Sequence, residues 1–265
     1  MTPAPRDMAR ALRHHPPMTE LATTIEGPNG RLAARRIAGE EPGVFWLGGF
    51  ASDMTGTKAA FLSDWAVRAG RAFVRFDYSG HGASQGRFED GTIGAWTSDA
   101  LAVFDALAEG PQILVGSSMG AWIATLLALA RPEQLKGCVF IAPAPDFTEE
   151  LIWKQLGEEK KERLMRDGRL VERTSDGGTS VITRRLVEEG RGRLVLGRPI
   201  PVSCPVRILH GMNDEEVPFR HAVRFAEQLV SGDLELTLVK AGDHRLSTPA
   251  DLERLRLAIA SLSRC

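Results

Sequence analysis

Residues 112–130 read QILVGSSMGAWIATLLALA: a short apolar run, a turn of glycine and serine, and a long apolar stretch. Residues 112–115 predict a buried strand, and residues 119–130 predict a helix that is apolar on nearly every side and therefore central. The turn between them, GSSMG at 116–120, has the pattern G-x-S-x-G. Its glycines permit a bend too tight for side chains, and the bend aims the serine oxygen outward at the helix start. We therefore predict Ser118 as the nucleophile of an acyl-transfer reaction.

A second copy of the pattern, GASQG at 82–86, competes with the first. Its serine, Ser84, lies well past the end of the nearest predicted strand, and the residues that follow do not begin a helix. A hydroxyl in such a loop commonly bonds to nearby backbone. Ser117 adjoins the predicted nucleophile, but the turn would aim its side chain elsewhere. We expect a structural role for Ser84.

Strands and helices alternate along the chain on both sides of the turn. The expected strands lie at 44–47, 72–76, 139–141, 206–209 and 234–239, and the expected helices at 57–69, 95–107, 219–230 and 249–262. This rhythm predicts an α/β fold with a mainly parallel sheet and helices on both faces. The length of 265 residues suits one such domain, at 18–265, after a flexible tail at 1–17.

Charged residues become frequent within a stretch at 146–200, and this stretch interrupts the α/β pattern. Within it, DGG at 176–178 predicts a hairpin turn between two short apolar pairs. The stretch fits either a solvated insert or a lid whose apolar side covers a pocket, and its position favours the lid. Trp153, with neighbouring leucines, would then bind substrate, or would only pack onto the domain.

A serine hydroxyl needs a base, which is commonly a histidine held by a carboxylate. In this arrangement the chain order is serine, acid, histidine, with each group on a loop after a strand. Three of the six histidines precede Ser118 and are excluded by that order. His210 ends a strand and is expected to be packed and hydrogen-bonded, while His221 begins a helix and is expected at the surface. His244 follows the strand at 234–239 and is the predicted base.

The acid is expected after the strand at 206–209, where residues 210–218 read HGMNDEEVP. Asp214 comes first, at the apex of the loop, and is the predicted acid; Glu215 is the alternative. Glu215 and Glu216 are otherwise a solvated pair at a helix entry, favoured there by the helix dipole. Asp243 adjoins the predicted base, but neighbouring side chains point apart, so it is a weaker candidate.

The negative oxygen of an acyl-transfer intermediate needs two backbone donors. The amide of Met119, directly after the nucleophile, is one candidate. The other is the amide of Phe50 in the sequence GGF at 48–50, because glycines after the strand at 44–47 allow a close backbone approach. An ordinary glycine turn is the alternative. The side chains of Phe50 and Met119 would line the acyl pocket.

The overall composition narrows the partners and the compartment. A net charge of -1 gives no field to gather nucleic acid or an anionic membrane. The three cysteines are scattered along the chain, which suits a reducing compartment, and their spacing does not match that of a zinc site. No apolar run is long enough to span a membrane. Residues 1–17 lack the apolar core of a secretory signal. We expect a cytoplasmic protein with neither metal nor organic cofactor; nothing in the sequence sets its oligomeric state.

These residues together resemble the α/β-hydrolase superfamily, whose D-x-x-G-x-G-x-S loop is matched by DYSGHGAS at 77–84. More specifically, the chain is similar to the depalmitoylating acyl-protein thioesterases and acyl-glucuronide esterases typified by α/β-hydrolase domain-containing protein 10. The segments that carry this likeness are GFASDMTGTKA at 49–59, RFDYSG at 75–80, HGMND at 210–214 and DHR at 243–245. The resemblance spans about residues 40–260 and implies a triad of Ser118, Asp214 and His244.

The sequence as a whole predicts a serine hydrolase that cleaves carboxylic esters or thioesters with a hydrophobic acyl group. The same triad could instead cleave a lactone, a peptide or a carbon–carbon bond. Epoxide and haloalkane hydrolysis are not expected, because those reactions would use an aspartate in place of Ser118. A non-catalytic receptor on the same fold is a further alternative, although such a receptor would commonly lack one of the three residues.

Overall fold

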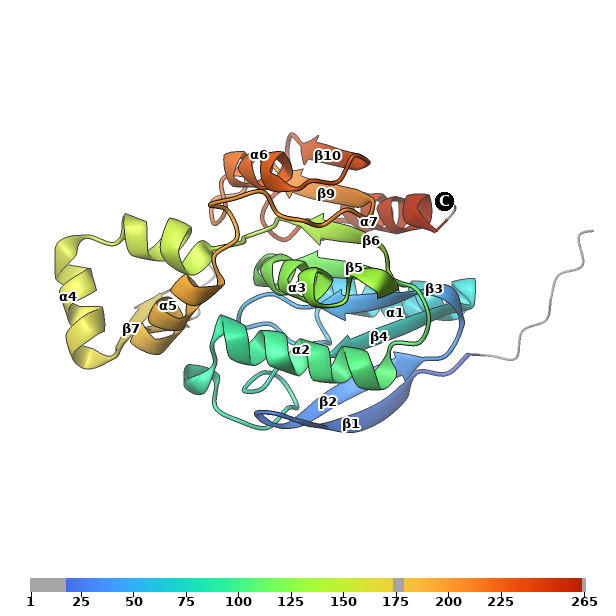
Figure 1. The fold of residues 1–265 in the computed structure, drawn as a ribbon, viewed down its shortest axis with the longest axis horizontal. Coiled ribbons are helices and arrows are strands. Elements are labelled where there is room, and N and C mark those ends of the chain that lie inside the picture. Colours follow the sequence, from blue (N-terminus) through green and yellow to red (C-terminus); the bar gives the residue numbers. More distant parts are fainter. Residues whose placement is uncertain (1–17, 174–178, 264–265) are drawn as a thin grey trace, which may run out of the picture.

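The structure is a computed structural model that describes residues 18–173 and 179–263. Within these residues, eight strands form one sheet in the order β1-β2-β4-β3-β5-β6-β9-β10 (Figure 1). All neighbours from β4 to β10 pair in parallel, whereas β2 pairs antiparallel with both β1 and β4. The strands are β1 (Leu21–Gly27), β2 (Gly30–Ile37), β3 (Glu40–Leu47), β4 (Arg71–Phe76), β5 (Gln112–Ser117), β6 (Leu135–Ile141), β9 (Val206–Gly211) and β10 (Leu234–Val239). The predicted α/β fold with a mainly parallel sheet is confirmed.

Helices cover both faces of the sheet. Apolar side chains of α1 (Thr57–Ala69) and α7 (Pro249–Leu262) pack on one face, and those of α2 (Ile93–Leu107), α3 (Met119–Ala130) and α6 (Phe219–Gln228) pack on the other. Nine of the twelve residues of α3 are buried, as its apolar circumference predicts. The cores on the two faces fix the sheet, and the carboxyl ends of its parallel strands meet at one edge.

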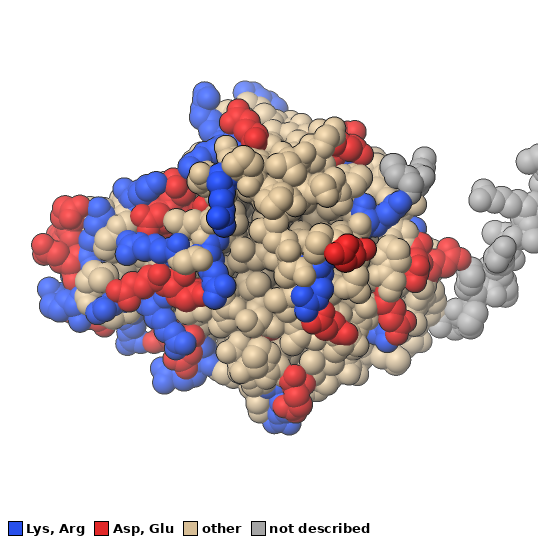
Figure 2. All heavy atoms as spheres, viewed as in Figure 1, with Lys and Arg blue, Asp and Glu red and all other residues tan. Residues whose placement is uncertain are grey.

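An insert follows β6 and projects beyond that edge; we call residues 148–193 the lid (Figure 1). It consists of a π-helical turn (Thr148–Ile152), 3-10 turns (Trp153–Gln155 and Arg191–Arg193), α4 (Glu158–Asp167), β7 (Arg169–Arg173), β8 (Thr179–Thr183) and α5 (Arg184–Gly190). Four side chains form its own small core: Leu164, Leu170, Ile182 and Val187. Charged side chains gather densely over the lid, whereas much of the rest of this face is uncharged (Figure 2).

The paired strands β7 and β8 run antiparallel, as the predicted hairpin requires. The predicted turn at 176–178 itself lies outside the described residues, as does the predicted tail at 1–17. No helix within the described part of the chain is both long enough and apolar enough to cross a membrane.

Three helices and one strand, α1, α3, α7 and β10, begin and end at the predicted residues. The hairpin of β1 and β2 was not predicted from the sequence. In β2 only Leu32, Ala34 and Ile37 are buried, and three of the other five residues are arginines, while β1 is an edge strand whose Leu21 is 66% exposed. A strand at the edge of a sheet buries too few apolar side chains to give a strong periodic signal.

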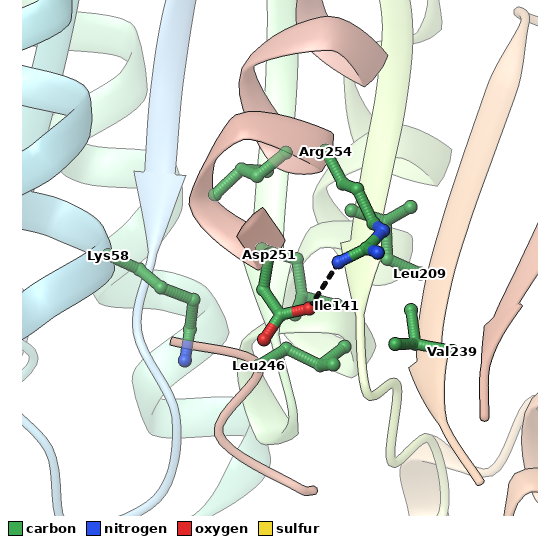
Figure 3. Close-up of a pocket in the computed structure, with 8 residues that line it drawn as sticks. Lys58, Ile141, Leu209, Val239, Leu246, Asp251 and Arg254 are labelled. Atoms are coloured by element: carbon green, nitrogen blue, oxygen red, sulfur yellow. Dashed lines mark hydrogen bonds and ion pairs between the residues drawn. The ribbon is translucent and has the colours of Figure 1, made fainter. Parts of the chain in front are cut away.

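A narrow cleft lies where α1 and α7 meet the ends of β6, β9 and β10 (Figure 3). Lys58 of α1 and the ion pair of Asp251 with Arg254 (2.8 Å) supply its polar side chains. The cleft is too narrow to admit a water molecule. None of the three predicted triad residues lines it, so this cleft is a packed seam between helices and not the substrate site.

Candidate active site

The turn from β5 into α3 holds Ser118 in a strained conformation. Ser118 has φ 55° and ψ -118°, a backbone region that non-glycine residues rarely adopt. A Cβ at Gly116 would meet the backbone of Gly120, and a Cβ at Gly120 would meet the carbonyl oxygen of Leu47 on β3. The two glycines of the motif are therefore required by close packing. The amide of Ser118 donates to the carbonyl of Ile141 at 2.9 Å, which fixes the turn between two strands.

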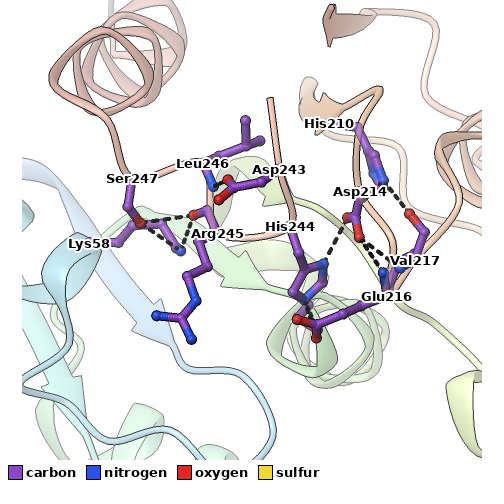
Figure 4. Close-up of polar contacts among 11 residues, drawn as sticks. Lys58, His210, Asp214, Glu216, Val217, Asp243, His244, Arg245, Leu246 and Ser247 are labelled. Atoms are coloured by element: carbon purple, nitrogen blue, oxygen red, sulfur yellow. Dashed lines mark hydrogen bonds and ion pairs between the residues drawn. The ribbon is translucent and has the colours of Figure 1, made fainter. Parts of the chain in front are cut away.

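The three residues predicted as a triad come together at the carboxyl edge of the sheet. Figure 4 shows the contact between Asp214 and His244. His244 Nε2 lies 3.1 Å from Ser118 Oγ, and His244 Nδ1 lies 2.7 Å from Asp214 Oδ2. Asp214 follows β9 and His244 follows β10, each on a loop. The side chain of His244 is 15% exposed and that of Asp214 is fully buried. The site therefore opens to solvent on the side of the serine and the histidine.

Asp214 accepts hydrogen bonds on both carboxylate oxygens. The amides of Glu216 and Val217 donate to Oδ1 at 2.9 and 2.8 Å, and His210 Nε2 lies 3.2 Å from Oδ2. Burial opposes ionisation, but the bonds from His210, His244 and the Val217 amide, with the charge of His244, hold the pKa of Asp214 well below its usual range. Asp214 is therefore an anion at neutral pH and accepts a hydrogen bond from the protonated Nδ1 of His244. The other ring nitrogen, Nε2, is then free to accept the serine proton.

His210 is buried and hydrogen-bonded, as expected. Its Nε2 lies 2.9 Å from the carbonyl oxygen of Val217 as well as near Asp214. Both partners are acceptors, so Nε2 carries the proton. His210, on β9, thus hydrogen-bonds to the loop that carries Asp214.

The loop that carries His244 is fixed by its own turn. Asp243 Oδ1 accepts from the amide of Leu246 at 2.8 Å, and Leu246 has φ 42°. Asp243, the weaker candidate acid, therefore shapes the loop while Asp214 contacts the histidine ring. A Cβ at Gly242 would meet the Cα of Gly211, so the loop of His244 also packs against the start of the loop of Asp214.

Lys58 holds this loop from α1. Its Nζ donates to the carbonyl oxygen of Arg245 at 2.5 Å and lies 3.5 Å from Ser247 Oγ (Figure 4). Burial lowers the pKa of Lys58 to about 8, against the attraction of Asp243 and Asp251. Lys58 lies within one of the segments that carry the family resemblance, but the sequence indicated no role for it. Its contact depends on two segments 187 residues apart, which local patterns do not reveal.

The loop after β3 passes directly beside the nucleophile. A Cβ at Gly49 would lie 3.5 Å from Ser118 Cβ, so glycine is what permits this approach. The next residues are held by Ser52, whose Oγ donates to the Gly49 carbonyl at 2.8 Å. Within residues 18–173 and 179–263, the amides of Phe50 and Met119 have no hydrogen-bond acceptor. Both candidate oxyanion donors therefore stay unpaired beside the serine.

Aromatic rings surround Phe50. The centroid of its ring lies 4.9 Å from that of Phe88, 5.9 Å from Trp96 and 5.7 Å from Phe147. Phe50 also packs against the small core of the lid. The Met119 side chain is 1% exposed and lies in the main core. Phe50 is thus the contact between the loop at the serine, the main core and the lid.

Trp153 lies on the lid, packed against its core. The guanidinium of Arg191 lies 4.6 Å from its ring centroid and the ammonium of Lys161 lies 5.6 Å away. These cations hold the ring on the lid, as expected for cation–π contacts. A contact of Trp153 with substrate stays a prediction.

Two side chains outside the site, Ser84 and His221, can be compared with what the sequence predicted for them. Ser84 Oγ donates to the carbonyl of Asp77 at 2.6 Å and accepts from the amide of Ala33 at 2.8 Å, which is the expected structural role. The expectation that His221 is at the surface is wrong: it is buried, with Nε2 2.7 Å from the Pro145 carbonyl. Phe225, one turn further along α6, packs in the main core and draws the first turn of that helix inward. Burial lowers the pKa of His221.

Glu216 makes a contact that the sequence analysis did not predict. Its side chain is 63% exposed, as expected of a solvated residue, yet Oε2 lies 3.7 Å from His244 Nε2. The only sequence signal for Glu216 was its place two residues after Asp214.

No group of three or more metal-binding side chains that could hold an ion occurs in the described part of the chain.

Comparisons with known proteins show which family the chain resembles in sequence and fold. Residues 44–187 match the family described as serine aminopeptidase S33. Over 255 residues the chain is 39% identical to the mitochondrial palmitoyl-protein thioesterase ABHD10 of Bos taurus, covering 96% of this chain and 82% of that protein. The crystal structure of a protein titled "Putative hydrolase" from Agrobacterium vitis S4 matches with a TM-score of 0.88 and 44% identity, covering 94% of this chain and 100% of that one. The α/β-hydrolase domain-containing protein 10 from mouse matches with a TM-score of 0.84 and 37% identity, covering 92% and 97%.

Proposed function

The chain belongs to the hydrolase family described as serine aminopeptidase S33, and we propose that it cleaves carboxylic esters or thioesters of hydrophobic acyl groups through an acyl-enzyme. The observation that carries this proposal is the line of contacts from Ser118 through His244 to Asp214, with distances of 3.1 and 2.7 Å. A serine on a strained turn, a histidine and a buried carboxylate in this order are the parts that serine acyl transfer requires. The related thioesterases support a thioester of a long acyl chain as substrate.

In the first half of the proposed reaction, Ser118 Oγ attacks the carbonyl carbon of the substrate. The serine proton moves to His244 Nε2, and Asp214 stabilises the imidazolium that forms. The tetrahedral intermediate then collapses. The bond from the carbonyl carbon to the leaving oxygen or sulfur breaks, and the proton on Nε2 goes to that leaving atom. The acyl group remains on Ser118.

In the second half, water attacks the acyl-enzyme and gives a proton to His244 Nε2. Collapse of the second tetrahedral intermediate releases the carboxylic acid and returns the proton to Ser118 Oγ. In both halves the negative oxygen would accept from the amides of Phe50 and Met119. Their unpaired state within the described residues and the approach of Gly49 to Ser118 support this assignment.

The acyl chain would lie under the lid. Phe50 packs against both the main core, which includes Met119, and the lid core, against which Trp153 also packs. We therefore assign these three side chains to the acyl-binding surface. Apolar contacts of this kind would favour longer acyl chains, by up to about 0.8 kcal/mol for each buried methylene.

The test is a series of p-nitrophenyl esters from acetate to palmitate, with Ser118→Ala as the blank. A maximum in kcat/KM at octanoate or longer supports the proposal and leads to acyl-protein thioesters as substrates. A maximum at acetate, falling steeply with length, would mean a closed pocket and a small-ester hydrolase. Absence of Ser118-dependent hydrolysis at every length would overturn the proposal.

A peptidase is the second candidate, because the matching family is described as a serine aminopeptidase. Aminoacyl p-nitroanilides separate the two candidates. Hydrolysis of these amides at rates within about tenfold of the best ester would favour the peptidase, since amides are much the harder bond for an esterase site to break.

We propose a reducing compartment, the cytoplasm, for this protein. Cys138 and Cys204 are free thiols with their sulfurs 3.8 Å apart, which suits a compartment that keeps thiols reduced. The similar thioesterases are named as mitochondrial, so fractionation of source cells is the test. Recovery in a mitochondrial fraction would contradict the cytoplasmic assignment.

A further inference from the structure

The carboxylate of Glu216 stands beside the atom that serves the leaving group. Oε2 of Glu216 lies 3.7 Å from His244 Nε2 (Figure 4). In the proposed reaction Nε2 first takes the serine proton and then gives a proton to the departing oxygen or sulfur. Any leaving group must therefore pass within a few ångström of this carboxylate.

The position of Glu216 is set by the triad acid. The amides of Glu216 and Val217 both donate to Asp214 Oδ1, and the Val217 carbonyl accepts from His210. The backbone that carries Glu216 is thus fixed by the same carboxylate that orients His244. Its side chain is 63% exposed and stands at the open side of the histidine.

The charges around this point leave the Glu216 side negative. Asp214 is buried and already bonded to His244 and His210. Lys58 lies beneath the loop with its ammonium on the Arg245 carbonyl. The side chain of Arg245 lies apart from Glu216 in Figure 4, with no dashed line between the two. Glu215, the residue immediately before Glu216, is exposed and adds a second negative charge nearby.

We propose that Glu216 makes the charge of the leaving group a determinant of specificity, so that the site prefers neutral or cationic leaving groups and discriminates against anionic ones. This inference rests on the proposed function. A leaving group with its own carboxylate, such as a glucuronic acid or an acidic thiol, meets Glu216 as a like charge. A thiol that carries an ammonium group meets it as an opposite charge. Two unit charges about 7 Å apart near a wet surface change a rate by roughly three- to tenfold.

Three octanoyl thioesters that differ only in the leaving thiol provide the test: thiocholine (cationic), N-acetylcysteamine (neutral) and 3-mercaptopropionate (anionic). For each substrate, kcat/KM of Glu216→Gln is divided by that of the unmodified protein, which cancels the different reactivities of the thiols. Relative to the neutral thioester, we expect this quotient to rise about three- to tenfold for the anionic substrate and to fall similarly for the cationic one. Any effect of Glu216 on His244 alone would change all three substrates equally and would cancel.

Further variants sharpen the result. Glu216→Lys should shift the two quotients about twice as far on a logarithmic scale, because the change in charge is twice as large. Glu215→Gln removes one charge from the neighbouring position and should shift them less than Glu216→Gln does. Raising the salt from about 20 mM to 0.5 M should reduce the Glu216 effect, since screening acts within a few ångström at that ionic strength.

Equal quotients for the three thioesters would overturn this inference while leaving the proposed function intact. Failure of all three to be hydrolysed in a Ser118-dependent way would instead overturn the proposed function. An equal effect of Glu215→Gln and Glu216→Gln would show that net loop charge, and not the contact with His244, sets the preference, and would also overturn the inference.

Discussion

The corner that holds Ser118, Asp214 and His244 and the lid above it are built in different ways. In the corner, glycines bring backbones into contact, the carboxylate of Asp214 is fully buried, and Lys58 of α1 binds the loop of His244. The lid has a core of four apolar side chains, at about 1.5–3 kcal/mol each, and a surface of exposed ion pairs. The comparison leads us to expect that the proposed chemistry rests on the strongly held region, and selection of the acyl chain on the weakly held one.

The two regions meet at Asp146, the residue that leads into the lid. Its buried carboxylate accepts from the amides of Val195 and Leu196, at the far end of the insert, with shortest distances of 2.8 Å to each. Burial raises the pKa of Asp146 in spite of these bonds. One side chain therefore joins the entry and the exit of the lid.

The largest effect should come from the corner itself. Ser118→Ala should reduce kcat at least about a thousandfold, because the nucleophile is lost while the fold is kept. Ser84→Ala, in the second copy of the motif, should stay within about tenfold of the unmodified protein. Ester hydrolysis under saturating substrate measures both. Near-normal turnover by Ser118→Ala would contradict the proposed role of the corner.

The junction comes next. Asp146→Ala should lower the free energy of unfolding by about 2–4 kcal/mol, because two buried amides lose their acceptor. It also places alanine at φ 57°. Asn tolerates that backbone conformation and keeps one acceptor, so Asp146→Asn should cost less than half as much. Urea unfolding measures the difference, and limited proteolysis of the lid checks where the loss occurs. Equal losses for the two variants would argue against this junction.

Lys58 tests how firmly the corner must be held. Lys58→Met should reduce kcat about tenfold with a smaller change in KM, because the His244 loop loses its tether from α1 while the substrate surface remains. Lys58→Arg should recover part of the loss. Equal losses in the Met and Arg variants would contradict a role for the bond to the Arg245 carbonyl.

Lys58 also predicts a dependence of stability on pH. Its pKa is about 8 in the folded protein and near 10.5 when the chain is unfolded. The unfolded state therefore binds more protons between these values, and the contribution of Lys58 to stability grows as pH rises through that window and is lost below pH 8. Urea unfolding from about pH 7 to 10 should show a smaller rise for Lys58→Met than for the unmodified protein. Parallel curves would contradict the lowered pKa.

The smallest effect should come from the lid surface. Lys160 and Glu172 form an ion pair at 2.5 Å, with side chains 48% and 45% exposed. Lys160→Gln should change the free energy of unfolding by less than about 0.5 kcal/mol, because solvent screens such pairs. A loss above about 1.5 kcal/mol in urea unfolding would mean that the lid is held more like the corner, and the comparison would fail.

Local sequence patterns were sufficient for much of the fold and of the candidate site. The turn around Ser118 and the helix after it are continuous in the chain, and chain order led to Asp214 and His244. Contacts between distant segments left no such pattern, which is why Lys58 and the burial of His221 were missed. The edge hairpin of β1 and β2 was missed because few of its residues are buried. The composition shift located the insert, but its four core side chains are too few to define its elements in advance.

The most direct test of the account is reaction of the protein with a fluorophosphonate, followed by mass mapping of the modified peptide. We predict one adduct on Ser118, formed quickly in the unmodified protein and absent in Ser118→Ala. Slower labelling in Asp214→Asn would follow from loss of the carboxylate that orients His244. An adduct on Ser84, or no adduct while the fold is intact, would contradict the claim that Ser118 is the nucleophile.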